Sequence, residues 1–579
     1  MITKMKKYTF LVFHKEYDAF LETLREAGVM HIREKAGGMA DDPELQEALQ
    51  KADGLRRLIK QGAPDQLLQE KAEVEQKIAA TEKEAERMQV FGNFNPDTLA
   101  KLKEAGYALY LYSVSKSQFV AEWGIIVGEV GGKVYFVSME ALPEELPVTE
   151  VTLNGHNAAQ LGQDIEALRG LLTAANARIE AWALANLDNL RAELKATEQT
   201  IDWKRVQLNT TALAEDSLML IEGFCPADTV ENLNAKLETL NSVYYEVEDP
   251  TDEDPTPIKL KNNKFFQMFE CLTGMYGWPN YNEFDPTPIL GPFFLLFFAF
   301  CMGDSGYGVL LTVIGILIAK GKLKIEMFDG LGPIITALGI GTTVIGFFLG
   351  SFFGMNLAEQ LPAISDIFLN GKFMDTTFDF QMVLALGIGI FHICLAMVVK
   401  AICYTKQSGF VNNLGTWGWT LLVVGGVLVM SIGLLMALPM ETIKWILIVL
   451  GGISALGIYI LNDVHRNPLI NVGSGLWETY NMVTGLMGDV LSYVRLYALG
   501  LAGGMLGAAF NTLGLMVRGE DPNIGTWIGF LLIVVIGHGL NLALSALGAF
   551  VHPLRLSFVE YFKNVGYEGK GKKYEPFKK

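Results

Sequence analysis

The distribution of apolar residues divides the chain into two halves. Over residues 1–285 short apolar runs alternate with charged residues, whereas from Pro288 onward long apolar runs are broken only by short polar loops. Apolar runs of this length are typical of helices that cross a membrane. The pattern therefore predicts a soluble domain over residues 1–285 and an α-helical transmembrane domain over residues 286–579.

The apolar runs of the second half predict eight spans. As one helix, segment 288–320 would reach about 50 Å, well beyond the ~30 Å hydrocarbon core, and it has lysines on both sides. We therefore expect it to cross twice, with a turn near Gly303–Gly306. The last two spans are longer than the core requires, so they should tilt or project from the membrane. The remaining spans are expected at roughly 330–356, 380–402, 414–436, 443–461, 474–516 and 525–562.

The basic residues give this topology a direction. The loops expected outside contain three basic residues, Lys372, Lys444 and Arg518. The loops expected in the cytoplasm, with the C-terminal tail, contain twelve: Lys320, Lys322, Lys324, Lys400, Lys406, Arg466, Lys563, Lys570, Lys572, Lys573, Lys578 and Lys579. Because cytoplasmic loops are enriched in Lys and Arg, we expect both termini in the cytoplasm. The first twenty residues lack an apolar run long enough for a signal peptide, which agrees.

The soluble half alternates β-rich and helical patterns at its two ends. Residues 6–35 are predicted as strand, helix and strand, and residues 217–248 repeat the pattern. Two such units can pair into one ferredoxin-like lobe. We therefore expect a proximal lobe formed by residues 1–42 and 214–250.

Between these ends the pattern predicts two long polar helices that form a coiled-coil hairpin, at 43–91 and 156–213. Apolar residues of the second helix step by four and three along one seam, namely Leu161, Ile165, Leu168, Leu172, Ala175, Ile179 and Trp182. Residues 92–155 again mix helix with strand and predict a distal lobe. The α+β rod that results favours a spacer over a catalytic domain. A proline-rich acidic linker over 246–285 should join it to the membrane half.

Composition excludes several functional classes. The net charge of −17 argues against nucleic acid as a partner. The chain contains no G-x-x-x-x-G-K-[ST] motif, so we do not expect it to hydrolyse a nucleotide itself. Its five cysteines form no C-x-x-C pair, which favours reduced thiols without a zinc site. We therefore expect no catalytic residues, no metal and no cofactor on this chain.

Ionisable residues inside apolar spans are costly and are candidates for function. They are Asp304, His392, Glu478, Asp489, Arg495, His538, His552, Arg555 and Glu560. Arg495 lies deepest, about a dozen residues from either end of its apolar stretch, too far to reach the interface easily. Arginine keeps its charge on burial and its planar fork can bind a carboxylate. Facing a membrane-embedded Asp or Glu of another subunit, it would lower the pKa of that carboxyl and release a bound ion.

Structural explanations compete with these functional ones. Gly500, Gly503, Gly504 and Gly507 follow Arg495 at helical spacing, and they would suit either packing within the chain or a smooth face for another subunit. An ion pair of Arg495 with Asp489 is disfavoured, because six residues rotate a helix by about 240°. Asp304 would equally suit a turn cap, and Glu560 and Arg555 would suit anchors near the interface. His392 and His538 favour hydrogen-bonded core histidines, and His552 can face the same way as Arg555.

Three membrane motifs resemble one known family. GDVLSYVRLYALGLAGG (488–504), LSALGAFVHPLRLSFVEYF (544–562) and FCMGDSGYG (300–308) are similar to the membrane stator subunit of V/A-type rotary ATPases, called subunit a or I. GFFLGSFFG (346–354) and IEGFCP (221–226) resemble further segments of that family, so the likeness covers nearly the whole chain.

The resemblance implies a set of roles. Arg495 and Arg555 match the two arginines of the family's ion path, and Glu478 and Asp489 occupy acidic positions of its prokaryotic branch. Asp304 would lie toward the outer half-channel, and His552 and Glu560 are further half-channel candidates. Ser545 and Gly503 stand where the eukaryotic branch has a glutamate and a histidine, which fits the prokaryotic branch and makes Ser545 a half-channel candidate.

The resemblance also implies partners and a location. A rotor ring of small ion-binding subunits would pass the glycine stripe, peripheral stalks would bind the rod, and the catalytic ATPase head would connect indirectly. The chain would lie in the lipid bilayer of a prokaryotic plasma membrane. The transported ion stays open between H⁺ and Na⁺. The main alternatives are a stand-alone secondary transporter, which predicts internal repeats that we do not find, and a sensor, which predicts a separate output domain.

Overall fold

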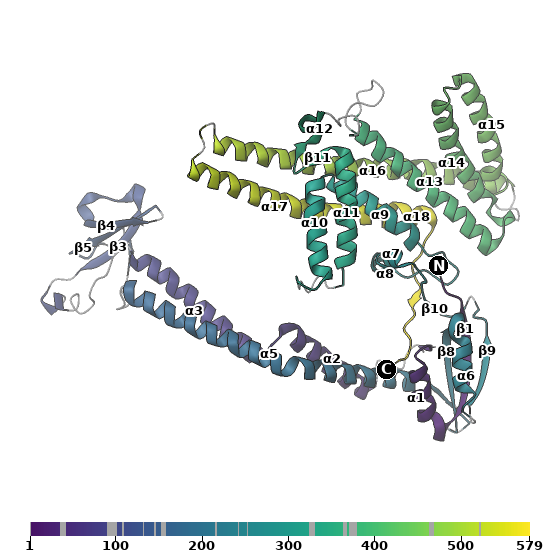
Figure 1. Cartoon of the computed structure of the whole chain (residues 1–579), viewed down its shortest axis with the longest axis horizontal. Coiled ribbons are helices and arrows are strands. Elements are labelled where there is room, and N and C mark those ends of the chain that lie inside the picture. Colours follow the sequence, from purple (N-terminus) through teal and green to yellow (C-terminus); the bar gives the residue numbers. More distant parts are fainter. Residues whose placement is uncertain are drawn as a thin grey trace. The chain divides into compact units, whose positions relative to one another are not determined.

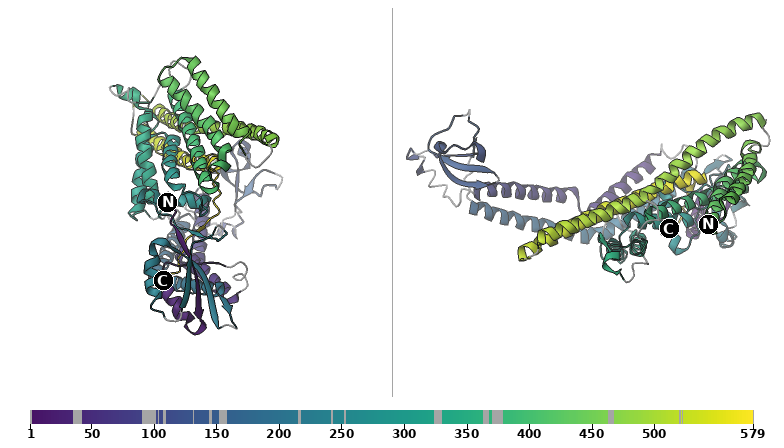
Figure 2. Two further views of the ribbon diagram at one scale, coloured as in Figure 1. Left: turned by 90° about the vertical axis from the view of Figure 1, so that its right-hand side faces the viewer. Right: turned by 90° about the horizontal axis from the view of Figure 1, so that it is seen from above.

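The computed structural model confirms a helical membrane half joined to an α+β half (Figures 1 and 2). It divides into two compact units, Met1–Arg33 with Ala212–Lys578, and Glu34–Thr211. Lys324, Lys372, Arg466 and Lys579, which entered the topology argument, lie outside the described residues. The structure describes residues 2–34, 42–89, 101–102, 104–106, 109–130, 132–143, 146–151, 158–214, 217–240, 243–251, 253–323, 330–362, 368–369, 379–462, 468–519, 521 and 523–578.

The first unit contains a sheet built from both ends of the soluble half. Its main strands are β1 (Met5–Phe13), β2 (His31–Ile32), β8 (Leu218–Pro226) and β9 (Val243–Glu248), in the antiparallel order β2-β8-β1-β9. Short strand β7 (Thr211–Leu213) pairs with β8 at the side. Alternate residues of β1 are buried beneath α1 (Tyr17–Ala27) and α6 (Val230–Leu237), as a half-buried strand requires. The two strand–helix–strand segments therefore form a single layer of helices on one sheet.

The second unit contains the helical arms and a small sheet. The arms are α2 (Pro43–Gln61), α3 (Asp65–Gln89) and α5 (Ala158–Asn209), and the sheet has the order β4-β5-β3-β6. Those strands are β3 (Tyr110–Ser115), β4 (Ile125–Val130), β5 (Lys133–Ser138) and β6 (Thr149–Glu150). Ion pairs Arg169–Glu82 and Arg178–Glu70 join α5 to α3, whose residue numbers run in opposite directions. The arms are therefore antiparallel.

Two boundaries of the expected arms need correction. The first arm is not one helix over 43–91, because α2 ends at Gln61 and is followed by Gly62, which adopts a left-handed conformation with φ of 70°. Pro64 follows and cannot donate the next backbone hydrogen bond, so α3 starts anew. The second arm ends at Asn209, because residues 211–213 leave the helix to form β7.

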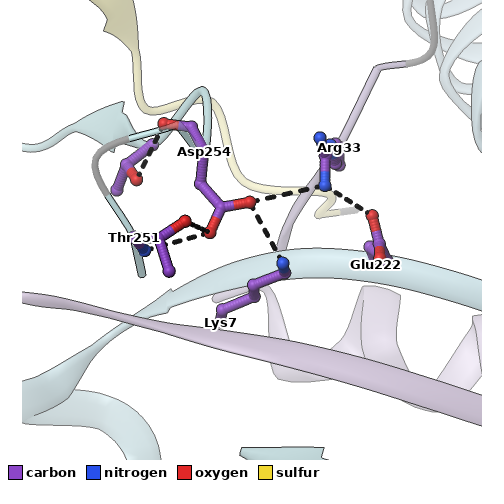
Figure 3. A network of polar contacts seen from close by, with 6 residues as sticks. Lys7, Arg33, Glu222, Thr251 and Asp254 are labelled. Carbon is purple, nitrogen blue, oxygen red and sulfur yellow. Dashed lines mark hydrogen bonds and ion pairs between the residues drawn. The ribbon is translucent and has the colours of Figure 1, made fainter. Parts of the chain in front are cut away.

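Residues 246–285, expected as a linker, are held to the proximal sheet by a polar network (Figure 3). The Asp254 carboxylate accepts hydrogen bonds from Lys7 Nζ at 3.0 Å and from the Thr251 backbone N–H and hydroxyl at 3.0 and 2.8 Å. Arg33 lies 3.4 Å from the same carboxylate and 2.8 Å from Glu222. Burial alone would raise the pKa of Asp254, but the Thr251 and Lys7 hydrogen bonds outweigh it and lower that pKa.

The C-terminal tail adds a second connection to the same sheet. Strand β13 (Lys572–Lys573) pairs in parallel with β10 (Pro257–Ile258). The Tyr574 hydroxyl then donates to the Val29 carbonyl at 2.6 Å, and the Phe577 N–H donates to the Met30 carbonyl at 2.8 Å. Two short helices, α7 (Lys264–Gln267) and α8 (Glu270–Tyr276), lead from this point into the membrane half.

Six helices of the described chain are long and apolar enough to cross a membrane. They include α11 (Gly332–Leu349), α13 (Phe380–Ser408), α14 (Leu414–Leu435) and α15 (Met440–Tyr459). The last two are α16 (Pro468–Arg518) and α17 (Ile524–Arg555), which pack against each other and are followed by a π-helical segment, Leu556–Tyr561, and α18 (Phe562–Val565). At 51 residues α16 is about 77 Å long, far more than the hydrocarbon core.

The remaining two expected spans are shorter than the other six. Segment 288–320 does break at Gly303 and Asp304, into α9 (Thr287–Met302) and α10 (Ser305–Ala319). These have 16 and 15 residues, or about 24 Å each. The count of eight crossings therefore stays a prediction, because these two are shorter than the ~20 residues that a helix needs to span the core.

Candidate functional site

Arg495 lies on α16 beside the C-terminal part of α17. Its side chain is partly buried, and its Nη1 atom is buried without a hydrogen-bond partner among the described residues. Both Arg495 and Arg555 lie close enough to His552 to act on it electrostatically. The structure therefore brings the three predicted basic residues together. Because a guanidinium stays charged on burial, this point of the helix pair attracts an anionic group such as a carboxylate.

Asp489 does not neutralise Arg495. Asp489 is 7% exposed, and its carboxylate lies 3.2 Å from Lys563 Nζ and accepts a hydrogen bond from the Asn564 side chain at 2.8 Å. Lys563 and Asn564 belong to α18, after the last long helix. The expectation that Asp489 and Arg495 lie on different faces of α16 agrees with this pairing, and no ion pair of Arg495 is found within the described ranges.

Glu478 and Asp489 line the same polar cavity. This cavity has a volume of about 400 Å³ and lies between α13, α14, α16 and α18. Glu478 accepts a hydrogen bond from Asn462 at 3.3 Å. The polar residues of the wall are Lys400, Tyr404, Thr416, Thr420, Asn462, Glu478, Asn481, Asp489, Lys563 and Asn564. The cavity therefore brings two carboxylates and two ammonium groups together.

Glu560 is buried deeper, in the π-helical segment Leu556–Tyr561. Its side chain is 2% exposed, so it is not the interface anchor that the sequence left open. Its backbone carbonyl accepts from the Asn564 side chain, which also donates to Asp489. Arg555, in contrast, is exposed in this chain.

The four glycines of the stripe occupy different environments. A Cβ on Gly500 would lie 2.7 Å from the Phe300 carbonyl, and one on Gly507 would lie 3.1 Å from Gly354 Cα, so both sit against the chain's own backbone. A Cβ on Gly503 would meet Ser545 at 3.0 Å. Only Gly504 of the four has no atom within 4 Å of its Cβ position among the residues that the structure describes. Intramolecular packing therefore accounts for Gly500, Gly503 and Gly507, and the open position is Gly504.

Ser545 belongs to a hydrogen-bonded chain that the sequence argument missed. Its hydroxyl donates to Asn541, whose amide group donates to the Tyr307 hydroxyl at 2.8 Å and the Gly503 carbonyl at 2.9 Å. The Tyr307 hydroxyl lies 2.6 Å from His538 Nδ1, and His538 Nε2 lies 3.0 Å from Asn511 Oδ1. A search for uncharged polar residues inside the spans would have found both asparagines, because a buried amide needs partners.

Asp304 is a buried helix cap. It is 1% exposed, and one carboxylate oxygen accepts from the backbone N–H groups of Gly306, Tyr307 and Phe353. The other oxygen accepts from the Ser351 hydroxyl and the Gly354 N–H, each at 2.7 Å. Five donors thus occupy this carboxylate, which favours the cap that the sequence left as an alternative.

A second cavity, of about 380 Å³, borders the open side of the glycine stripe. Gly500, Gly504, Tyr497 and Gln381 line it, together with residues of 349–356. The Tyr497 hydroxyl donates to Asp379, at the start of α13. Asp304 shapes this cavity indirectly, because it holds Ser351 and Gly354 in the wall.

Comparisons with known proteins place these motifs in one group. Residues 147–345 and 476–579 match the model of the V-type ATPase 116kDa subunit family. The "V-type ATP synthase subunit I" of Borreliella burgdorferi is 26% identical over the full length of both chains, as is "V-type ATP synthase subunit I 1" of Treponema pallidum. The "A-type ATP synthase subunit I" of Methanocaldococcus jannaschii is 32% identical over 63% of this chain and 55% of its own length.

Proposed function

Because the chain belongs to the V-type ATPase 116kDa subunit family, we propose that it is the membrane stator subunit of a V/A-type rotary ATPase and supplies its ion path. A membrane subunit of a rotary ATPase agrees with the six long apolar helices and with the full-length relatives. The ATP chemistry belongs to other subunits, with which ion flow through this chain is coupled.

One observation carries the proposal, namely the charged Arg495 side chain held inside an apolar helix pair without a carboxylate partner in the described structure. A carboxylate on a rotor-ring subunit, passing along α16, would meet this guanidinium beside the C-terminal part of α17. The positive charge stabilises the ionised carboxylate and so displaces its bound ion, by several kcal/mol at the low effective dielectric of such a site. Arg555, whose guanidinium acts on the same His552 ring as Arg495, increases the positive potential at that point.

The two cavities supply the paths to this point. The cavity of Glu478 and Asp489 is the cytoplasmic path, because it lies near α18 and the basic C-terminal tail. The cavity of Tyr497 and Gly504 lies further along α16, toward the outer end, and is the outer path. Asp304 maintains its wall through Ser351 and Gly354, and Ser545 is connected to the neighbouring backbone through Asn541, which donates to the Gly503 carbonyl.

The soluble half joins the membrane half to the rest of the complex. Peripheral stalk subunits bind the lobes and antiparallel arms, and through them the catalytic head is held against rotation. Neither role requires a nucleotide on this chain. The membrane is the prokaryotic plasma membrane, with both termini in the cytoplasm. Cysteines introduced at positions 322 and 570 should react only from the cytoplasm, and one at 441 only from outside; an externally reactive position 322 would contradict this topology.

Substitution of Arg495 tests the function directly. Arg495→Gln and Arg495→Lys should both abolish ATP-driven ion uptake into vesicles while the complex still assembles, because lysine replaces the planar fork with a point charge that is more easily neutralised. Arg555→Lys should be milder, since Arg555 is exposed in this chain. Arg518→Gln is the matched control, because Arg518 lies at the end of α16, over the Trp527 ring. Near-normal uptake by an assembled Arg495→Gln complex would refute the proposal.

A further inference from the structure

A group of polar side chains is buried in the core between α13, α16 and the π-helical segment. His392, Tyr493, Ser557, Glu560 and Tyr561 are each at most 2% exposed. They come from three elements that contact one another. We call this group the buried polar cluster.

Several polar atoms of the cluster have no partner in the described part of the protein. These atoms are His392 Nε2, Ser557 Oγ, Glu560 Oε2 and the Tyr561 hydroxyl. His392 Nδ1 is paired, at 2.9 Å from the Tyr493 hydroxyl, and the His392 ring stacks on Tyr561 with centroids 4.5 Å apart. Glu560 and Tyr493 are close enough to interact electrostatically. The unpaired atoms are therefore concentrated in one region, although buried polar atoms are almost always hydrogen-bonded.

The backbone of this region is also unusual. Three of the four residues with an unpaired atom lie in the π-helical segment Leu556–Tyr561, which follows Pro553 within the last long helix. A proline removes a helix hydrogen bond. π-Helical turns are rare in proteins, and those that occur are often found at functional sites. A distorted helix that buries three unpaired polar groups is costly, and apolar packing alone gives no compensation for that cost.

The cluster is linked to the polar cavity of Glu478 and Asp489. The Asn564 side chain donates to Asp489, which lines the cavity, and to the backbone carbonyl of Glu560, which belongs to the cluster. From Glu560 the polar groups continue to Tyr493, which lies two residues before Arg495 along α16, and from Tyr493 to His392 on α13. Polar groups thus lead from the cavity into the apolar core.

We propose that the buried polar cluster binds internal water molecules, which extend the cavity of Asp489 into the core as far as Tyr493, with the Glu560 carboxyl among their hydrogen-bonding partners. Water fits because it can donate and accept, and because buried waters usually bond to otherwise unsatisfied protein groups. A metal ion fits less well, because no group of three or more His, Cys, Asp or Glu that could hold one occurs in the described ranges. The role of this water in ion transfer rests on the function proposed above.

Cysteine reactivity with Ag⁺ in the assembled complex tests the water directly. In a chain whose native cysteines are replaced by alanine, Ser557→Cys should react with Ag⁺ added from the cytoplasmic side, because a thiol ionises and reacts only where water reaches it. Leu556→Cys is the matched control, since Leu556 is the neighbouring residue, is 0% exposed and has an apolar side chain. We expect Ag⁺ to react at least tenfold faster at position 557 than at 556. Equal rates at the two positions, whether both fast or both slow, would overturn the proposal.

If the Ser557→Cys chain fails to assemble, a structure of the unaltered complex provides a second test. A structure of the unaltered complex, at a resolution that shows other buried waters, should show water density within hydrogen-bond distance of Glu560 Oε2 and the Tyr561 hydroxyl. An empty cluster would overturn the inference. Its failure is separate from failure of the proposed function, because normal uptake by Arg495→Gln refutes the function and leaves these measurements unchanged.

Discussion

A comparison of Asp304→Asn with Asp304→Glu distinguishes two roles of Asp304, a structural helix cap and an ion-carrying carboxylate. As a cap, Asp304 needs the length and the acceptors of its side chain. Asparagine keeps the length and one oxygen, which can still accept from Gly306, Tyr307 and Phe353. Its amide nitrogen then faces the Gly354 N–H, so one backbone donor loses its acceptor at a cost of about 1–3 kcal/mol.

Glutamate keeps the charge but not the fit. Asp304 is 1% exposed, and the nearby backbone is closely packed, since a Cβ on Gly346 would lie 2.4 Å from the Ser305 nitrogen. An added methylene in such a site costs about 1–3 kcal/mol, and displacement of the carboxylate weakens several of its five hydrogen bonds. Asp304→Glu should therefore destabilise the chain more than Asp304→Asn. Asp304→Ala should cost most, about 3–5 kcal/mol, because all five donors lose the carboxylate.

The assays are thermal unfolding of the purified complex and ATP-driven ion uptake by the same preparation. If Asp304 is a cap, stability and assembly should decrease from Asp304→Asn to Asp304→Glu to Asp304→Ala. Ion uptake per assembled complex should then be nearly normal for Asp304→Asn. An ion-carrying carboxylate predicts the reverse, with Glu active and Asn assembled but inactive. Asp285→Asn, two residues before α9 begins, is the matched control, because Asp285 accepts from the Thr287 N–H at a partly buried site. An inactive, fully stable Asp304→Asn complex would refute the assignment as a cap.

Two further predictions follow from the packing and the charges. Gly500→Ala should destabilise the complex, because the added methyl would lie 2.7 Å from the Phe300 carbonyl, whereas Gly504→Ala should assemble normally. Native gels measure the amount of assembled complex for each variant, and equal amounts would contradict the packing argument. Asp254→Asn should loosen the attachment of residues 246–285 to β1, seen as faster proteolysis there, and the wild type should show the same loss only in acid. The sign follows from the lowered pKa: the folded state favours ionised Asp254, so its contribution is complete above the unfolded pKa of about 4 and is lost as the pH falls below that value. If the rate of proteolysis of the wild type did not change in acid, the assigned role of ionised Asp254 would be contradicted.

The periodicity of the sequence by itself determined the division into halves, the long helices and the break near Gly303. These features depend on local physics, because the pattern of apolar residues fixes which segments enter the membrane and glycine fixes where a helix turns. Arg495 could be selected for the same reason, since a charge deep in an apolar run is costly wherever the chain folds.

Only the tertiary structure decided what each polar group contacts. The sequence could not show that Asp489 pairs with Lys563, 74 residues away, or that Asp304 binds backbone groups of 353 and 354. Nor could it separate Gly500 and Gly507 from Gly504, because all lie on one helix and differ only in what the rest of the chain places beside them. Partners far apart in sequence are chosen by packing, and their distances leave no periodic signal in the chain.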